Sequence, residues 1–282
     1  MYHLFVEPFE VGFMQRALIV SLLVGAVGGV IGVYVVLRKR AFFADTLTHT
    51  VFPGVAIAFV AGGSLWLGAL LAGIASAVLF TLSTTNRRVD DDAAMAILLT
   101  TFFAIGVMIV SRITTYTNDL VVLLFGRVLT VDRGEIITAA VLGGAALLIV
   151  ALLHKELVFQ AFDPEGLRAA GYPPVLLDLA ANVAVTLVVV AAIQAVGTVL
   201  VIALLVTPAA VARLLTRSVG PMIAVGAAVG VACGYLGLVV SYSASIDHDL
   251  RLATGATIVV LLTVVFVVVS AASAGARRLR AT

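Results

Sequence analysis

The chain has 282 residues, 62% of them hydrophobic and 11% charged, with a net charge of +2. So little charge across so many long apolar stretches excludes an ordinary soluble domain and predicts a polytopic α-helical membrane protein. The few charges collect in short segments between the apolar stretches, so the lipid bilayer is an expected partner and nucleic acid is not. The single cysteine, Cys233, excludes disulfides and thiolate metal clusters within one chain.

Apolar segments long enough to cross a bilayer follow one another along the whole chain. They predict an all-α fold with about eight or nine transmembrane helices, in a single transmembrane domain over residues 1–282. In chain order the expected spans are 13–37, 42–60, 64–84, 93–111, 135–154, 176–195, 197–215, 219–241 and 254–274. The segment 119–131 is too short to span a bilayer and predicts a re-entrant or interfacial piece.

Lysine and arginine residues gather at alternate ends of these spans and predict the orientation of the chain. Because basic loops are retained in the cytoplasm, we expect the richer side to be cytoplasmic. The N-terminus is then outside the cell membrane and the C-terminus inside, which requires an odd number of helices. The cytoplasmic set is Arg38, Lys39, Arg40, Arg87, Arg88, Lys155, Arg168, Arg213, Arg217, Arg277, Arg278 and Arg280.

An aspartate and a histidine, Asp45 and His49, stand four residues apart in an otherwise apolar expected span. Ionisable side chains are rare in such spans and usually functional. Helical spacing puts both on one face, about 5–6 Å apart at Cβ, where a carboxylate and an imidazole can share a divalent transition metal ion. Pro53 cannot donate to the carbonyl of His49, so Pro53 and Gly54 predict a helix break beside a transport path.

Two simpler interpretations of Asp45 and His49 stay open on the residues alone. The two side chains could form a hydrogen bond that only packs helices together. They could also lie near the membrane surface, because the basic residues 38–40 end only five residues before Asp45.

Two further segments carry possible functional residues. In the loop 155–174, Asp163 can cap a short helix at about 163–171, with Pro164 at its first position and Gly171 at its end. On the residues alone this helix is an amphipathic connector. In the expected outer loop from Ser241 to Asp249, a cluster of Asp247, His248 and Asp249 could guide cations by its negative potential, or be a solvated loop.

Motifs of common enzymes are missing from the sequence. Neither Lys39 nor Lys155 follows a glycine in a phosphate-binding loop, and the zinc-protease and serine-hydrolase motifs are absent. We therefore expect no catalysis in this chain. With one cysteine and no paired methionines, monovalent copper is not an expected cargo.

Several motifs occur together in a familiar order over nearly the whole chain. They are Phe5–Phe9, Asp45–His49 with Pro53 and Gly54, Asp91–Ile97, Leu124–Gly126, Phe162–Glu165, Ala209–Arg213 and Gly255–Val259. In this order they resemble the permease subunit of the manganese, zinc and iron importers of the ATP-binding-cassette (ABC) class. The chain departs from that pattern at Thr46, Thr48 and Thr50, where the family more often has alanine or serine.

The resemblance implies a permease like those of type II ABC importers. It implies a dimer with a second permease copy, identical or not, two separate ATPase subunits, and an extracellular metal-binding protein that delivers the ion. It also implies that Asp45 and His49 are metal ligands, and that two copies together offer an Asp₂His₂ set, which suits zinc and is tolerable for manganese.

The metal would be the transported substrate, Mn²⁺ or Zn²⁺ with Fe²⁺ as a further candidate, and no cofactor would be held permanently. The resemblance further implies that the short helix near 163–171 couples to the ATPase. Its coupling residues would be Phe162, Asp163, Pro164, Glu165 and Arg168. The alternative function is an ion-coupled secondary metal transporter or channel that needs no ATPase.

Overall fold

The computed structural model describes residues 9, 11–85, 89–111, 130–247 and 252–281. Over this part of the chain the secondary structure is helical, and nine helical segments are long and apolar enough to cross a membrane. They follow the expected spans closely, so the predicted all-α membrane fold is confirmed. Residues 119–129 of the expected re-entrant piece lie outside the described ranges.

The helices have the following bounds. The nine long segments are α2 (Gly12–Leu37), α3 with α4 (Ala41–Thr50 and Phe52–Val60), α5 (Leu65–Thr85), α6 (Asp91–Val110), α8 (Arg133–Leu152), α11 (Pro174–Val196), α12 (Thr198–Leu215), α13 (Val219–Asp247) and α14 (Thr254–Ala281). Two short helices, α9 (His154–Phe162) and α10 (Pro164–Ala169), connect α8 to α11.

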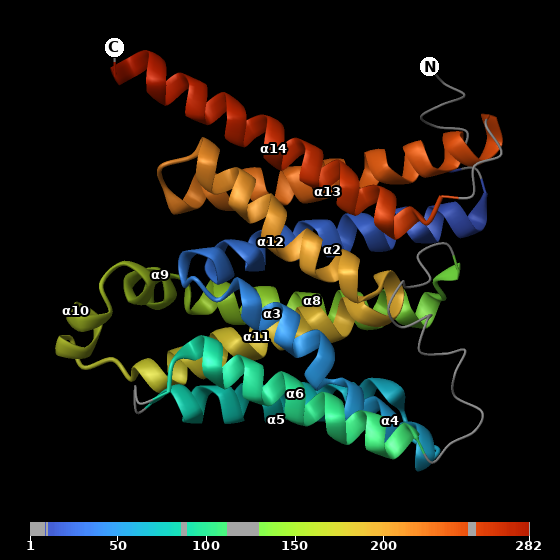
Figure 1. Cartoon of the computed structure of the whole chain (residues 1–282), viewed down its shortest axis with the longest axis horizontal. Helices are drawn as coiled ribbons and strands as arrows, with labels where there is room; N and C mark the ends of the chain where they lie inside the picture. Colours follow the sequence, from blue (N-terminus) through green and yellow to red (C-terminus); the bar gives the residue numbers. More distant parts are fainter. Residues whose placement is uncertain (1–8, 10, 86–88, 112–129, 248–251, 282) are drawn as a thin grey trace.

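The long helices lie side by side, and their ends form two opposite faces of the bundle (Figure 1). The turn between α2 and α3, the α9–α10 pair, the turn between α12 and α13 and the C-terminal end of α14 share one face, on the left of the view. These segments include Arg38–Arg40, Lys155, Arg168, Arg213 and Arg217. Basic residues that the sequence assigns to one side of the membrane therefore do lie at one end of the bundle.

Two expectations about helix boundaries were wrong. Residues 155–162 were expected in a loop but form most of α9, whose mixed polar and apolar sequence gives no transmembrane signal. The expected outer loop from Ser241 is helical as far as Asp247. The Ser241 hydroxyl is hydrogen-bonded to Thr254 Oγ1 at 2.9 Å and donates to the carbonyl of Leu252. This contact keeps the end of α13 against the start of α14.

Helices α2 and α13 pack closely against each other. Apolar burial drives helices together weakly in lipid, so small residues that let backbones approach are common at such contacts. A Cβ atom at Gly29 would overlap the carbonyl group of Gly226, and one at Gly25 would overlap that of Gly230. The glycines of α2 therefore serve helix packing.

We predict that Gly29→Ala destabilises the protein by roughly 1–3 kcal/mol, because the new methyl group has no room beside α13. Gly144→Ala on α8 is the matched control, since no described atom lies within 4 Å of a Cβ there. Thermal unfolding of the purified protein in detergent measures both variants. Equal melting temperatures for the two would contradict the packing argument.

Candidate functional site

The segment that holds Asp45 and His49 is divided into two helices. Helix α3 ends at Thr50 and α4 begins at Phe52, with Pro53 in its first turn. The N–H of Val51 donates to the carbonyl of Leu47, and the N–H of Val55 donates to the carbonyl of Val51, at 3.2 Å each. Helical hydrogen bonds therefore continue on both sides of the junction. Because Pro53 has no N–H, the carbonyl of His49 loses its usual helical donor.

Gly54 lets the chain after this junction lie directly against α5. A Cβ atom at Gly54 would overlap the carbonyl oxygen of Gly68 and crowd Ala72. The junction between α3 and α4 is therefore fixed by a close backbone contact one residue after Pro53.

Asp45 and His49 lie one turn apart on α3, with Oδ1 of Asp45 4.0 Å from Nε2 of His49. This distance is too long for a hydrogen bond between them. Two ligands that each bind a tetrahedral metal at about 2.1 Å stand roughly 3.4 Å apart, so a small side-chain rotation would bring both onto one ion. The pair is therefore not joined by a packing hydrogen bond, and its spacing is compatible with a shared metal ion.

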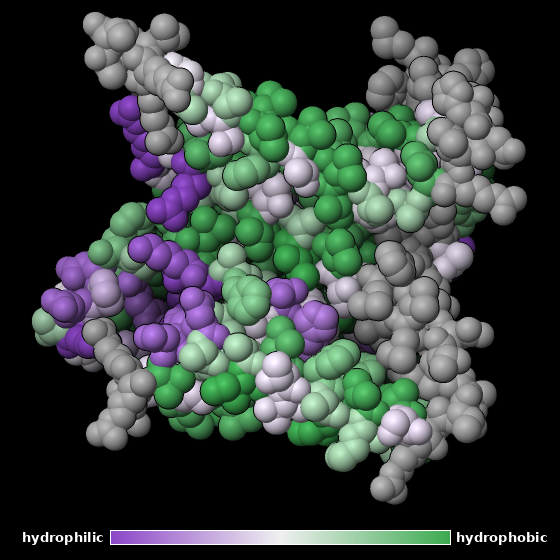
Figure 2. Space-filling model, in the orientation of Figure 1, coloured by the Kyte–Doolittle hydropathy of each residue, from purple (hydrophilic) through white to green (hydrophobic). Residues whose placement is uncertain are grey.

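Both side chains are reachable from outside the single chain, with 34% of His49 and 32% of Asp45 exposed. The space-filling view shows a hydrophilic patch over α3 in the middle of this face, surrounded by apolar surface (Figure 2). Within the described part of the chain, no group of three or more His, Cys, Asp or Glu residues could hold a metal ion. One chain therefore presents two possible ligands on its surface.

The rest of the site is apolar or already hydrogen-bonded. The ring of Phe103 in α6 meets the His49 ring edge-on at 5.9 Å and lies 5.7 Å from the ring of Phe52. Thr46, Thr48 and Thr50 are buried, and each hydroxyl donates to a backbone carbonyl of α3. The threonines that distinguish this segment therefore do not add free ligands beside the Asp45–His49 pair.

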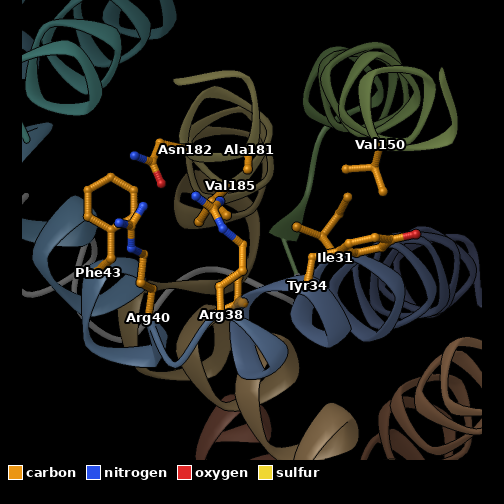
Figure 3. Close-up of a pocket in the computed structure, with 10 residues that line it drawn as sticks. Ile31, Tyr34, Arg38, Arg40, Phe43, Val150, Ala181, Asn182 and Val185 are labelled. Atoms are coloured by element: carbon orange, nitrogen blue, oxygen red, sulfur yellow. The ribbon is translucent and has the colours of Figure 1, made fainter. Parts of the chain in front are cut away.

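Two arginine side chains of the turn before α3 point into the protein rather than into its surroundings. The side chains of Arg38 and Arg40 are only 8% and 15% exposed, and both pair with Asp178 in α11. Figure 3 shows them reaching toward α11, with Arg40 beside Phe43. The closeness of Asp45 to residues 38–40 therefore does not by itself put Asp45 at the membrane surface.

Burial, with the nearby charge of Arg40, lowers the pKa of Arg38 to about 10, and Asp178 opposes that fall. Arg38 thus stays charged at neutral pH. Sequence reasoning did not find this cluster, because it used the arginines only to assign the orientation of the chain in the membrane. Arg38 and Asp178 are 140 positions apart in the sequence, so local patterns could not indicate their contact.

The short helix α10 has the predicted N-terminal cap, and the predicted coupling residues are exposed. The Asp163 carboxylate accepts a hydrogen bond from the N–H of Gly166 at 2.8 Å, and Pro164 is the first helical residue. Leu167 is fully buried and anchors the helix to the bundle, and Gly171, with φ +84, follows its end. The predicted coupling residues Phe162, Asp163, Pro164, Glu165 and Arg168 are all exposed.

The predicted outer cluster is only partly within the described residues. Asp247 is the last residue of α13, whereas His248 and Asp249 lie outside the described ranges. The proposed guidance of cations by these residues stays a prediction.

Comparison with known proteins decides the family. Residues 10–273 match the ABC 3 transport family over almost the whole chain. This chain belongs to the ABC 3 transport family. The resemblance inferred from the sequence motifs is therefore confirmed, and so is a multi-pass membrane permease.

Relatives of this ABC 3 family chain cover nearly its full length. The manganese transport system membrane protein MntC of Halalkalibacterium halodurans is 36% identical over 93% of this chain and 88% of its own. The chelated iron transport system membrane protein YfeD of Yersinia pestis is 35% identical over 95% of this chain and 88% of its own. The solved structure of PsaBC from Streptococcus pneumoniae in complex with Fab is similar with a TM-score of 0.82, 32% identity and 95% coverage of each chain.

The turn between α2 and α3 holds a non-glycine residue, Lys39, in a backbone conformation that favours glycine. Lys39 has a φ of 57, and the N–H groups of Lys39 and Arg40 donate back to Val36 and Val35. This is the helix end that glycine usually occupies. We predict that Lys39→Gly is more stable than Lys39→Val by about 1–2 kcal/mol, because only glycine adopts positive φ without a clash. Both variants lose the same charge, so unfolding in detergent compares them directly. Equal stability would contradict strain at this turn.

Proposed function

We propose that this chain is the membrane-spanning permease subunit of an ATP-driven importer of divalent transition metal ions. The observation that carries the proposal is the Asp45–His49 pair, 4.0 Å apart and partly exposed in a membrane-spanning segment. In this proposal the ion is the substrate, and the chain holds no permanent cofactor. The chain performs no catalysis itself, and ATP is hydrolysed by separate ATPase subunits.

The donor atoms support a hard or borderline divalent ion. Carboxylate oxygen and imidazole nitrogen suit Mn²⁺, Fe²⁺ and Zn²⁺, whereas Cu⁺ prefers sulfur ligands. MntC is named for manganese and YfeD for chelated iron, so the names of relatives favour Mn²⁺ and Fe²⁺ over Zn²⁺. A transport site must also release its ion, and two ligands from one chain bind weakly enough to permit this.

A second permease copy, identical or a sister chain, would complete the site. Because Asp45 and His49 are each about one-third exposed, another subunit can approach the same ion. Two copies related by a two-fold axis would contribute two carboxylates and two imidazoles, a four-coordinate set. The junction at Val51 and the His49 carbonyl, which lacks the donor that Pro53 cannot supply, would lie beside the path of the ion.

The two end faces of the bundle indicate where the remaining partners would bind. The face with α10 and the basic residues would be cytoplasmic, with the exposed residues Phe162, Asp163, Pro164, Glu165 and Arg168 contacting an ATPase subunit. The N-terminus would then be outside the cell membrane, where an extracellular binding protein would deliver the metal, with Asp247 near that outer face.

We predict that Asp45→Asn and His49→Ala each abolish Mn²⁺ uptake by the reconstituted complex, because each removes a ligand from the path. Protein abundance and assembly should persist, since neither side chain has a structural hydrogen bond among the described residues. Asp92→Asn, an exposed carboxylate at the start of α6, is the matched control and should transport normally.

Normal uptake by either site variant would remove Asp45 and His49 from the transport path. Uptake that survives ATP depletion but collapses with the proton gradient would instead favour a secondary carrier. Measuring uptake with Mn²⁺, Fe²⁺ and Zn²⁺ in turn identifies the preferred ion.

We predict that the double variant Glu165→Lys, Arg168→Glu uncouples ATP hydrolysis from transport, because it reverses the charges that α10 presents to its partner. Mn²⁺ binding to the permease should be unchanged, since α10 is far from α3 along the chain and at the end of the bundle. Arg217→Glu, exposed in the turn between α12 and α13, is the control for a charge change on the same face. Coupled transport by the double variant at the normal rate would exclude α10 as the contact.

A further inference from the structure

A single carboxylate, that of Asp178 near the start of α11, receives donors from three other segments. Arg38, at the end of α2, donates to Asp178 Oδ1. Arg40, directly before α3, donates to the same oxygen at 3.2 Å, and Gln160 of α9 donates to it at 3.1 Å. One oxygen atom therefore joins the ends of α2, α3 and α9 to α11.

Arg40 connects this point to the helix that carries Asp45 and His49. Its carbonyl accepts the N–H of Phe43 in the first turn of α3. Its guanidinium also donates to Asp91 of α6 at 3.0 Å and lies 5.3 Å from the ring centre of Phe80, which stacks on Phe43. A displacement of Arg40 would therefore move the N-terminal end of α3.

Gln160 connects the same point to the short helices at the end of the bundle. Besides Asp178, its side-chain amide donates to the carbonyl of Pro174 at 3.3 Å. The other end of α9 is held by a 2.6 Å hydrogen bond between the Tyr34 hydroxyl and His154 Nδ1. Helix α9 leads into α10 through Asp163, which caps α10. A displacement of α10 would therefore be transmitted to Asp178 through α9, which is held at both ends.

The charges in this cluster compensate one another. Two arginines, Arg38 and Arg40, face two carboxylates, Asp91 and Asp178, around a polar cavity of about 330 Å³ that also reaches Pro164 and Arg168 of α10. Arg38 and Arg40 are largely buried, so breaking their pairs would leave a charge poorly compensated, and the four groups are expected to move together.

We propose that Asp178 and Gln160 are positioning residues that transmit motion of α10 to the N-terminal end of α3, and so to Asp45 and His49. This inference rests on the proposed function, because it needs a metal ion at α3 and an ATPase at α10. It adds the physical link between these two places, which lie at different depths of the bundle (Figure 1).

Gln160→Leu is the sharpest test, because it removes the link to α9 and leaves all four charges paired. The experiment uses the complete complex of permease, ATPase subunits and binding protein in proteoliposomes with Mn²⁺. The number of ions imported per ATP hydrolysed is expected to fall by about threefold or more, in the range of coupling effects of single residues. The affinity of the complex for Mn²⁺ should stay within about twofold, because the substitution does not touch α3.

Gln194→Leu is the matched control, since Gln194 is a partly buried amide toward the other end of α11, and it should keep the normal ratio. Asp178→Asn should lower the ratio further, and Asp178→Glu should restore part of it. A merely structural role would instead lower abundance and ATPase activity together and leave the ratio unchanged.

The outcomes separate this inference from the proposed function. If His49→Ala abolishes import while Gln160→Leu keeps the normal ratio, the link through Asp178 is wrong and the metal site stands. If His49→Ala imports Mn²⁺ normally, the proposed function is wrong, and this inference falls with it.

Discussion

Charge inside a membrane-spanning bundle has to be compensated within the protein, and this constraint organises the structure. Arg38 and Arg40 are largely buried and pair with the partly exposed Asp178 and Asp91, so two cations meet two anions at one end of the bundle. Asp45 is different, because in the described part of the chain the ionisable group that lies beside it is His49, 4.0 Å away. A carboxylate with so little compensation attracts a mobile cation, which is the physical basis for expecting an ion there.

Local patterns allowed the transmembrane helices to be predicted from the sequence. Apolar length defines a span whatever its neighbours are, so each expected span has its counterpart among the described helices. The cap of α10 could also be predicted, because Asp163, Pro164 and Gly171 act within a few residues of each other. Helix α9 could not, since its sequence has neither enough apolar residues for a span nor a clear cap.

In the candidate site, too, local features could be predicted from the sequence and contacts between distant segments could not. The Asp45–His49 pair depends on helical spacing within one segment, and its two side chains do lie one turn apart on α3. The ring that packs on His49, that of Phe103, comes from α6, and Asp178 of α11 holds Arg40 directly before α3. Contacts of this kind need tertiary structure, because nothing near Arg40 in the sequence indicates which carboxylate it will meet.

The end of α3 at Thr50 has an electrostatic consequence beyond its geometry. A helix carries a macrodipole whose C-terminal end has about half a negative elementary charge, concentrated on its last carbonyl groups. Because α3 stops within the membrane-spanning segment, that end lies beside His49, whose carbonyl accepts a backbone N–H of the helix cap in place of the donor that Pro53 lacks. Helix α4 begins one residue later, so its positive N-terminal end largely offsets this charge, and a cation beside α3 would be attracted mainly by the Asp45 carboxylate rather than by the main chain.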